Sequence, residues 1–345
     1  MSDRLRVLHL LPHARALGGT ERTVLDLLRS PELAHLDQRV AFVQPGRVIG
    51  FRRTWVLGGR GGAIAALPAI VRWRPQILHG WLLQGNVLGA LLAHALPSAR
   101  LVSSERNIGV HAQPRVKLAL EGFVAGAEDV ATCNSAAVRD AAAARVPRRA
   151  AAFRVIAPGV AAPVAVEPPR AATAVTVGRL HPVKDHATAL HAWRRVVAAR
   201  PEATLAIVGS GPERAPLEAL AQQLGLNGAV RFRGEGNPAS DLLGARMFLL
   251  SSRSEGFSRA VVEALAAGLP VVATDVGGMS EIGGEAVRVA PVGDDEALAA
   301  HVLAWLEDPG ALTRAAAAAR VVARRFAPAA CHRAYADLYA ELARR

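Results

Sequence analysis

The chain has 345 residues, 51% of them hydrophobic, which is enough material for two domains of ordinary size. No apolar run approaches the ~20 residues of a membrane-spanning helix, and the opening residues MSDRLRVLHLLP lack a signal-peptide pattern. Cys133 and Cys331 are too few for a disulfide framework and stand in apolar surroundings, so we expect reduced thiols in a cytoplasmic protein.

The formal net charge of +12 raises the possibility of a nucleic-acid partner. The basic residues are nevertheless scattered, and an aromatic content of 4% is poor for stacking bases. Lys117 and Lys184 are the chain's two lysines. Its heavy use of Arg and Ala is typical of a bias in genomic base composition more than of selection for a ligand. We expect no nucleic acid, although a basic nucleic-acid-binding protein remains the alternative from another functional class.

Strand-type runs alternate with helical stretches along the whole chain, the pattern of parallel βαβ units. In the first half, strands are predicted at residues 6–12, 39–45, 76–81, 100–104, 129–135 and 154–160, with helices between them that include 20–29 and 114–127. Residues 161–170 (AAPVAVEPPR) follow neither period and predict an extended linker.

The second half restarts the alternation. Its predicted strands are 174–180, 204–210, 230–234, 247–252, 270–274 and 286–290. A final helix over 331–345 places Tyr335, Leu338, Tyr339 and Leu342 on one face, which predicts packing against a core. The sequence therefore predicts two α/β domains, 1–160 and 171–330.

The segment 252–278, SRSEGFSRAVVEALAAGLPVVATDVGG, carries the most chemical information. Glu255 lies in the loop after a predicted strand, and Glu263 lies on the helix that Ser258 opens. Ligands of open α/β sheets bind at this edge, where two carboxylates can hold separate hydroxyls of one elongated ligand. The backbone amides of Gly256, Phe257 and Ser258, at the start of the helix, suit an anion or a sugar oxygen.

A second motif, VGRLHPVKD at 177–185, follows the first strand of the second half. Arg179 and Lys184 leave the strand end together, and Pro182 stiffens the turn between them. Fixed cations at such a position can stabilise the negative charge that develops on a diphosphate leaving group.

The acidic pair, the EGF turn, the run EALAAGLPVVAT and the continuation GG-x-x-E at 277–281 closely resemble the Glu-x7-Glu segment of glycosyltransferase family 4. The resemblance implies the GT-B fold of that family, with two Rossmann-like domains that face each other across a cleft. The first domain would bind the acceptor and the second the nucleotide sugar. The helix 331–345 would pack back on the first domain.

The resemblance further implies retaining, metal-independent transfer of a sugar, a hexosyltransferase-like activity, from a nucleotide diphosphate sugar to a hydroxyl, with a UDP-sugar favoured. Arg179 and Lys184 would bind the diphosphate, Glu255 the donor sugar and Glu263 the ribose. The GGTER loop would bring Gly18 and Gly19 to the donor phosphates. Gly209, in GSGPE, stands at a tight turn near the nucleotide.

The acceptor side departs from the family pattern, which places a His or His-Asp after the fourth strand of the first domain. This chain has LVSSERNIGVH there, so the candidates are Glu105, Arg106, Asn107 and His111. His79 and Trp81, which leave the preceding strand, are expected to line the same cleft.

No metal or other cofactor is expected, because no D-x-D follows a hydrophobic strand and no Cys/His ligand spacing occurs. A GT-B sugar-nucleotide epimerase remains open as an alternative. A glycosidase needs an acid and a base that flank one bond, and it has no use for the Arg/Lys pair.

The acceptors of the family are often lipid-linked and lie at the cytoplasmic face of the membrane, so a lipid-linked glycan or another glycoconjugate is the implied acceptor. Contact with an anionic membrane would use basic residues of the first domain, namely Arg115, Lys117, Arg139, Arg145, Arg148 and Arg149. An Arg-rich solvated surface, the product of genome composition, is the equal alternative.

Overall fold

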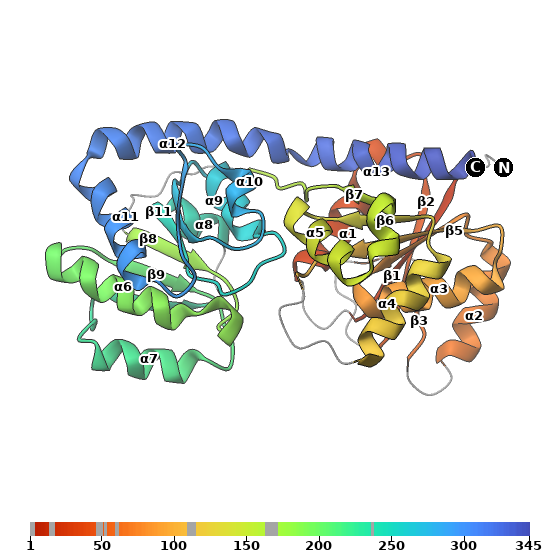
Figure 1. Cartoon of the computed structure of the whole chain (residues 1–345), viewed down its shortest axis with the longest axis horizontal. Coiled ribbons are helices and arrows are strands. Elements are labelled where there is room, and N and C mark those ends of the chain that lie inside the picture. The colour runs from red at the N-terminus through yellow and green to blue at the C-terminus, as the bar shows by residue number, and fades with distance from the viewer. Residues whose placement is uncertain are drawn as a thin grey trace. The chain divides into compact units, whose positions relative to one another are not determined.

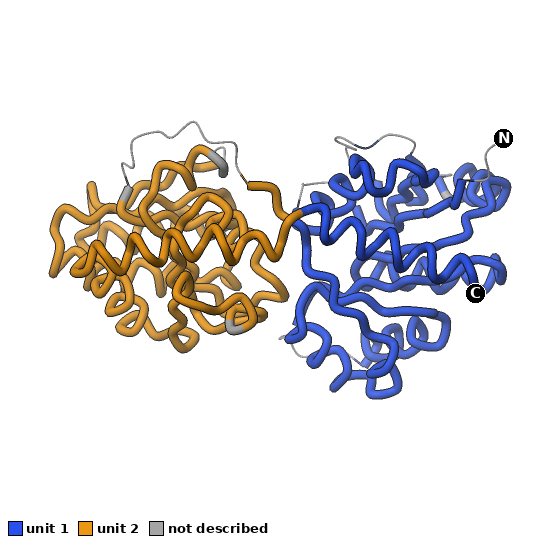
Figure 2. Tube along the Cα trace, turned by 90° about the horizontal axis from the view of Figure 1, so that it is seen from above, with its two compact units in different colours: residues 1–159, 328–345 blue, residues 160–327 orange. Residues whose placement is uncertain are grey.

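The computed structural model describes residues 4–13, 18–45, 51, 54–58, 62–108, 115–162, 172–235 and 238–345. The chain divides into two compact units, coloured separately in Figure 2. Unit 1 combines Met1–Gly159 with Pro328–Arg345, and unit 2 is Val160–Ala327. All but the first two residues of the predicted linker 161–170 lie outside the described residues.

The described part of unit 1 contains a seven-stranded, wholly parallel sheet in the order β3-β2-β1-β4-β5-β6-β7. The strands are β1 (Arg6–Leu11), β2 (Asp37–Phe42), β3 (Thr54–Val56), β4 (Ile77–Trp81), β5 (Arg100–Glu105), β6 (Val130–Cys133) and β7 (Phe153–Val155). The helices are α1 (Gly19–Arg29), α2 (Gly62–Trp73), α3 (Leu82–Ala95), α4 (Arg115–Ala127), α5 (Ala136–Arg145) and α13 (Pro328–Ala343), with 3-10 turns η1 (Pro31–Leu33) and η2 (Pro147–Ala152).

Alternate side chains of this sheet enter two different cores. Leu8, Leu10 and Leu78 pack with α2, α3 and α4 on one face. Val7, Ile77 and Trp81 pack with α1 and α13 on the other. Figure 1 shows α13 on the opposite side of the unit 1 sheet from α2, α3 and α4. The apolar stripe predicted for the last helix is confirmed as packing, because Tyr335, Leu338, Tyr339 and Leu342 are all buried.

Unit 2 repeats the architecture with a six-stranded parallel sheet among its described residues, in the order β10-β9-β8-β11-β12-β13. Its strands are β8 (Ala172–Val177), β9 (Leu205–Val208), β10 (Val230–Gly234), β11 (Ala245–Leu250), β12 (Val271–Thr274) and β13 (Val287–Ala290). Its helices are α6 (His186–Ala199), α7 (Arg214–Gln223), α8 (Pro238–Leu243), α9 (Arg259–Ala266), α10 (Met279–Ile282), α11 (Asp295–Glu307) and α12 (Pro309–Ala323), with 3-10 turns η3 (Pro182–Lys184) and η4 (Arg324–Phe326).

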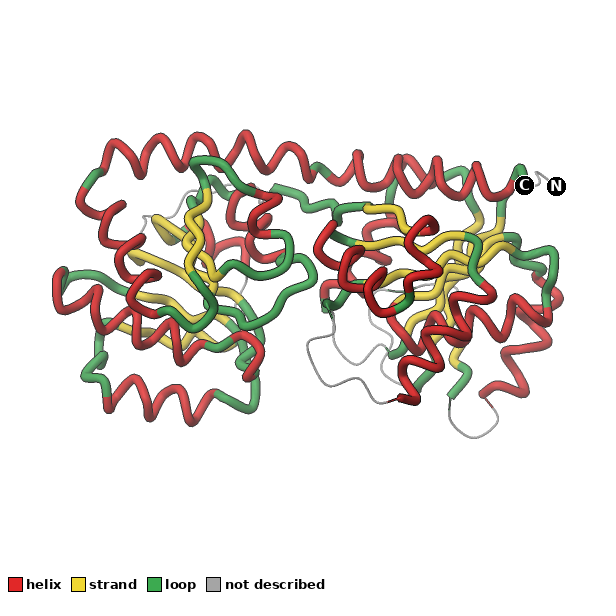
Figure 3. Tube along the Cα trace, viewed as in Figure 1, coloured by secondary structure: helices red, strands yellow, loops and turns green. Residues whose placement is uncertain are grey.

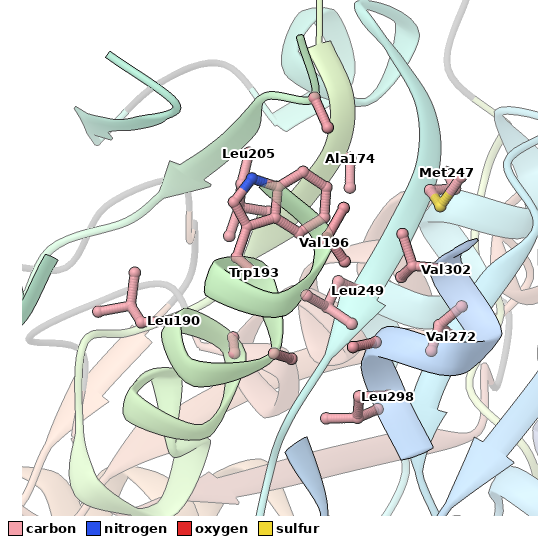
Figure 4. Close-up of a cluster of buried hydrophobic side chains, with 14 of the residues drawn as sticks. Ala174, Leu190, Trp193, Val196, Leu205, Met247, Leu249, Val272, Leu298 and Val302 are labelled. Carbon is pink, nitrogen blue, oxygen red and sulfur yellow. The ribbon is translucent and has the colours of Figure 1, made fainter. Parts of the chain in front are cut away.

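One core cluster of unit 2 lies between its sheet and two helices (Figure 4). Trp193 and Val196 of α6 meet Val302 of α11 over Leu249 of β11, and all four side chains are buried. Burial of each such side chain contributes about 1.5–3 kcal/mol to the folding free energy. This layer therefore helps to hold the sheet of unit 2 in place.

The predicted class, two Rossmann-like α/β domains with parallel sheets, is confirmed; in Figure 3 helices flank the strands of each unit. The three-residue edge strand β3 was not predicted. Other predicted strands run too far. The strand predicted at 204–210 ends at Val208, before Gly209 takes a φ of 145°. The one predicted at 129–135 ends at Cys133, because the Ser135 side chain caps α5 by accepting from the Val138 amide.

Among the described residues, no helix has both the length and the hydropathy that a membrane span requires.

Candidate functional site

The loops after β8 and β11 lie side by side at the carboxyl edge of the unit 2 sheet, because these two strands are paired neighbours. The later strand β11 joins the sheet on the side of β8 away from β9, so the strand order reverses direction between them. Open α/β sheets bind ligands at this kind of reversal. Arg179 and Lys184 follow β8, and Glu255 follows β11, so the sheet brings together residues that stand far apart in the sequence.

Lys184 and Glu255 form an ion pair in this site. The Lys184 Nζ lies 2.5 Å from Glu255 Oε1, and the Ser252 hydroxyl donates to the same oxygen at 2.8 Å. Both charged side chains are mostly buried, whereas Ser252 is fully buried. A charge-assisted contact of this length fixes the carboxylate relative to the ammonium. Arg179 is exposed beside them, at the strand end.

Contacts between the two loops hold the backbone that carries this pair. The Arg253 amide donates to the Val183 carbonyl at 2.9 Å, and the Ser251 hydroxyl donates to the Lys184 carbonyl at 3.1 Å. Asp185 ends η3 with a φ of 47° and accepts from the Arg253 guanidinium at 2.8 Å. The position of Lys184 is therefore set by the fold of both loops.

Glu263 lies one turn into α9 and has a different partner from Glu255. The Arg259 Nε donates to Glu263 Oε1 at 3.0 Å, an i,i+4 pair in which both side chains remain partly exposed. At the start of this helix the Ser258 hydroxyl is buried and has no hydrogen-bond partner among the described residues. The Phe257 ring packs edge-on against Phe326, with 5.5 Å between ring centroids.

Two glycines are required by close backbone contacts around the site. Gly277 has a φ of 61°, and a Cβ there would lie 2.3 Å from the Glu255 carbonyl oxygen. Gly209 has a φ of 145°, and its Cβ would lie 1.8 Å from the Gly178 carbonyl oxygen. Both positions therefore exclude side chains, and the backbone of the Glu255 loop packs directly on the turn after β12.

Unit 1 has the corresponding loop at Gly18 and Gly19, which are exposed after β1. Gly18 is the N-cap of α1, and a Cβ there would lie 2.8 Å from the Glu21 carboxylate. This confirms that the glycine pair opens a helix beyond the first strand. The contact of these two glycines with a donor stays a prediction.

The expectation that His79 and Trp81 line a cleft is wrong, because both are fully buried under α13. The His79 Nδ1 lies 2.6 Å from the Tyr339 hydroxyl, and its Nε2 lies 2.8 Å from Ser104 Oγ. The Trp81 indole donates to His9 Nδ1 at 3.2 Å. Burial lowers the pKa of His9 to about 4 and holds the pKa of His79 well below its usual value of 6.5, so both rings are neutral near pH 7.

Glu105 and Arg106 are also tied into the interior of unit 1. The Arg106 guanidinium lies 4.7 Å from the Trp81 ring centroid and donates to the Tyr335 hydroxyl at 3.4 Å. Glu105 pairs with Arg149 at 3.3 Å; burial raises the pKa of Glu105, against the opposing effect of that arginine. Asn107 is exposed, and His111 lies outside the described residues.

Two of the basic residues assigned to a membrane surface are internal, which corrects that expectation. Arg145 pairs with Glu121 at 3.2 Å, and Arg149 pairs with Glu128 at 2.5 Å. Arg149 is buried and Arg145 nearly so. Their charges are neutralised within unit 1 and do not contribute to an exposed basic face.

Sequence reasoning missed Ser252, Asp185 and Arg253, which support the Lys184–Glu255 pair. The Ser-Ser dipeptide at the end of a buried strand is the signal that could have identified Ser252, since a buried hydroxyl needs a hydrogen-bond partner. Within the described ranges, no three His, Cys, Asp or Glu side chains gather as metal ligands.

Comparison with known proteins agrees with this arrangement. Residues 163–322 match the family model described as glycosyl transferases group 1. Over 360 aligned residues the chain is 28% identical to the lipopolysaccharide core biosynthesis glycosyltransferase LpsD of Rhizobium meliloti (strain 1021), covering 97% of this chain and 98% of that one.

Two solved structures share the whole fold. HepE of Anabaena in complex with UDP matches with a TM-score of 0.83 at 19% identity, over 97% of this chain and 100% of that chain. Sucrose-phosphate synthase of Thermosynechococcus elongatus matches with a TM-score of 0.79 at 20% identity, over 98% and 99%. The chain therefore has the GT-B fold, and its sequence likenesses support a glycosyltransferase.

Proposed function

We propose that this chain is a retaining, metal-independent glycosyltransferase that moves a sugar from a UDP-sugar to a hydroxyl of a glycoconjugate at the cytoplasmic side of a membrane. The observation that carries the proposal is the Lys184–Glu255 pair at the carboxyl edge of β8 and β11, with Arg179 exposed beside it. HepE, which shares the fold, has been solved with UDP and with UDP-glucose, which favours a uridine donor.

Each residue of the site has a role in this proposal. Lys184 and Arg179 bind the donor diphosphate and offset the charge that it gains as it leaves. Glu255 accepts hydrogen bonds from hydroxyls of the donor sugar. Glu263, which lies on α9 and pairs with Arg259, accepts from the ribose hydroxyls.

Backbone groups complete the donor site. The amides of Gly256, Phe257 and Ser258 at the α9 N-terminus contact the sugar or a phosphate. Gly18 and Gly19 provide the same kind of contact from unit 1, and Gly209 keeps the turn after β9 compact near the nucleotide.

The proposed reaction needs no strong protein base. The bond between the anomeric carbon and the diphosphate oxygen breaks, and a bond from the same face of that carbon to the acceptor oxygen forms. The acceptor proton passes to the departing diphosphate oxygen, so the products are UDP and a glycoside with the donor's anomeric configuration. Burial of Glu105 and Arg106 in unit 1 favours a supporting role for both over direct proton transfer.

A thermal-shift screen over UDP-, GDP- and ADP-sugars tests the donor. Selective binding at one hundred times Kd stabilises the folded protein by about 2.7 kcal/mol, so a UDP-sugar should raise Tm more than the others. Transfer to an oligosaccharide acceptor should then continue in EDTA and give a product with retained configuration, read by proton NMR. Complete loss on chelation, restored by magnesium or manganese, would overturn metal independence.

A further inference from the structure

Helix α9 begins with a charge that helix stability alone would disfavour. Its first turn contains no acidic residue and opens on Arg259, although a cation at this end opposes the helix dipole. Arg259 also precedes its partner Glu263 by four residues, which is the less favourable order for an ion pair on a helix. The Ser258 side chain, at the N-cap, makes no capping hydrogen bond. The local rules of helix formation therefore give no reason for an arginine at this position.

The Arg259–Glu263 pair is also less exposed than a comparable pair elsewhere in unit 2. Its two side chains are 19% and 18% exposed. The Arg214–Glu218 pair has the same spacing and also opens a helix, α7, but its side chains are 43% and 45% exposed. Moving two charges partly out of water costs free energy that a surface pair does not require. The burial of the pair on α9 therefore favours a role in fixing the geometry of Glu263.

The role proposed for Glu263 depends on such geometry. The two ribose hydroxyls stand on neighbouring carbons, so one carboxylate binds both only within a narrow range of side-chain angles. A glutamate side chain that is free to rotate loses conformational entropy when a ligand fixes it. The Arg259 Nε donates to Glu263 Oε1 at 3.0 Å, and the planar guanidinium sets the direction of that bond. Arg259 can therefore orient the carboxylate before the nucleotide arrives.

We propose that Arg259 is a positioning residue that holds Glu263 in the orientation that reads the donor ribose, so that the site selects a ribonucleotide over its 2′-deoxy counterpart. The inference rests on the proposed function, in which Glu263 accepts from the ribose hydroxyls. Arg259 acts through this carboxylate, to which its Nε donates, whereas Arg179 and Lys184 contact the diphosphate.

Calorimetric titration of the full chain with UDP and with 2′-deoxy-UDP tests the proposal. Wild type should bind UDP about tenfold more tightly, because the deoxy form lacks a hydroxyl that donates to a carboxylate. Arg259→Met keeps a long side chain but has no donor. It should weaken UDP binding about fivefold and 2′-deoxy-UDP binding much less, so that the ratio of the two affinities narrows. Arg259→Lys, which retains a donor, should recover part of this ratio.

Arg195→Met is the matched control. The Arg195 Nε also donates to a carboxylate of unit 2, Asp295 Oδ2, at 2.7 Å. This pair joins the second half of α6 to the start of α11 and is more exposed than the pair on α9. The control should therefore bind both nucleotides as wild type does.

A double-mutant cycle shows whether Arg259 acts through Glu263. Glu263→Ala should bring the affinities for the two nucleotides close together. Adding Arg259→Met to this variant should change UDP binding little further, because no carboxylate is left to position. In transfer assays, Arg259→Met alone should raise the donor KM and leave kcat near wild type, since the ribose contact is the same in the ground state and the transition state. Its Tm should stay close to that of wild type.

Four outcomes would overturn the proposal. Equal weakening of UDP and 2′-deoxy-UDP by Arg259→Met would separate Arg259 from ribose recognition. An undiminished effect in the Glu263→Ala background would show that Arg259 contacts the nucleotide directly. A large fall in the Tm of Arg259→Met would indicate a structural role. Equal affinity of wild type for both nucleotides would exclude ribose selection by this pair.

Failure of the proposed function gives a different result. Wild type that binds neither UDP nor 2′-deoxy-UDP would contradict the uridine donor. GDP and ADP, each with its 2′-deoxy form, would then decide the role of Arg259 by the same comparison. Transfer to a soluble acceptor, measured on the same samples, reports on the proposed activity separately.

Discussion

The two units share one strand order but use the reversal point of their sheets differently. In each unit the first strand has the second on one side and the fourth on the other. In unit 2 the residues there, Arg179, Lys184 and Glu255, are charged and reach solvent. In unit 1, His79 and Trp81 of the corresponding strand β4 are sealed beneath the tyrosines of α13. A shared topology therefore fixes where a site can form, while the docked helix α13 decides that the side chains of β4 are covered.

Lys184→Ala should produce the largest effect if unit 2 holds the chemistry. Loss of a fixed cation from a charge-stabilising site lowers kcat by about 10²–10³. Steady-state kinetics with a soluble acceptor would measure this. Lys117→Ala removes the chain's other lysine, which lies in unit 1, and should leave the rate near wild type. Comparable rates for the two variants would remove Lys184 from the proposed site.

Tyr339→Phe should act on unit 1 alone. It removes the hydroxyl that contacts His79 Nδ1 at 2.6 Å and leaves a buried ring nitrogen without this partner. The expected loss is about 1–3 kcal/mol of unfolding free energy, measured by urea titration. The affinity for the donor should be unchanged. Weaker donor binding in the folded variant would show that the His79–Tyr339 contact of unit 1 affects the donor site.

The pH dependence of stability reports on the buried histidines of unit 1. Burial depresses the pKa of His9 from 6.5 to about 4, so between these values the unfolded chain binds a proton that the folded chain does not. The contribution of His9 to stability is therefore complete above pH 6.5 and falls by about 1.4 kcal/mol per pH unit as the pH drops toward 4.

His9→Gln isolates this contribution in Tm-against-pH profiles. The variant should lose less stability than its parent between pH 6.5 and 4. Glu105, whose raised pKa acts in the opposite sense, is common to both proteins and cancels in the difference. Parallel profiles for variant and parent would show that His9 does not carry the acid sensitivity.

Ser252→Ala should have the smallest effect. It removes one of the two contacts to Glu255 Oε1 and leaves the Lys184 pair in place. A net hydrogen bond of this kind contributes about 0.5–1.5 kcal/mol, which corresponds to a two- to tenfold lower kcat/KM. Ser252→Thr, which keeps a hydroxyl, should recover part of the rate. An unchanged rate in the alanine variant would mean that Lys184 positions Glu255 unaided.

Sequence patterns were sufficient for the central strands of both sheets because β4, β6, β9 and β12 are short, fully buried runs between helical stretches. They failed at β3, whose Thr54–Val56 is half-buried at the edge and has only three residues. In the candidate site, the closeness of Glu255 and Lys184 was predictable because strand ends converge on one edge. The buried state of His79 was not, since its partner Tyr339 lies 260 positions away and only the docked α13 supplies it.

The position of α13 in the chain constrains how unit 1 can form on a ribosome. Cys331, Tyr335 and Leu338 complete the core on one face of a sheet whose strands all lie before residue 156. Translation of the intervening residues takes about 10–30 s at typical rates. Unit 2, whose residues are contiguous, can fold during that interval. The unit that is synthesised first is therefore the last to close, and until then its sheet exposes an apolar face that chaperones can recognise.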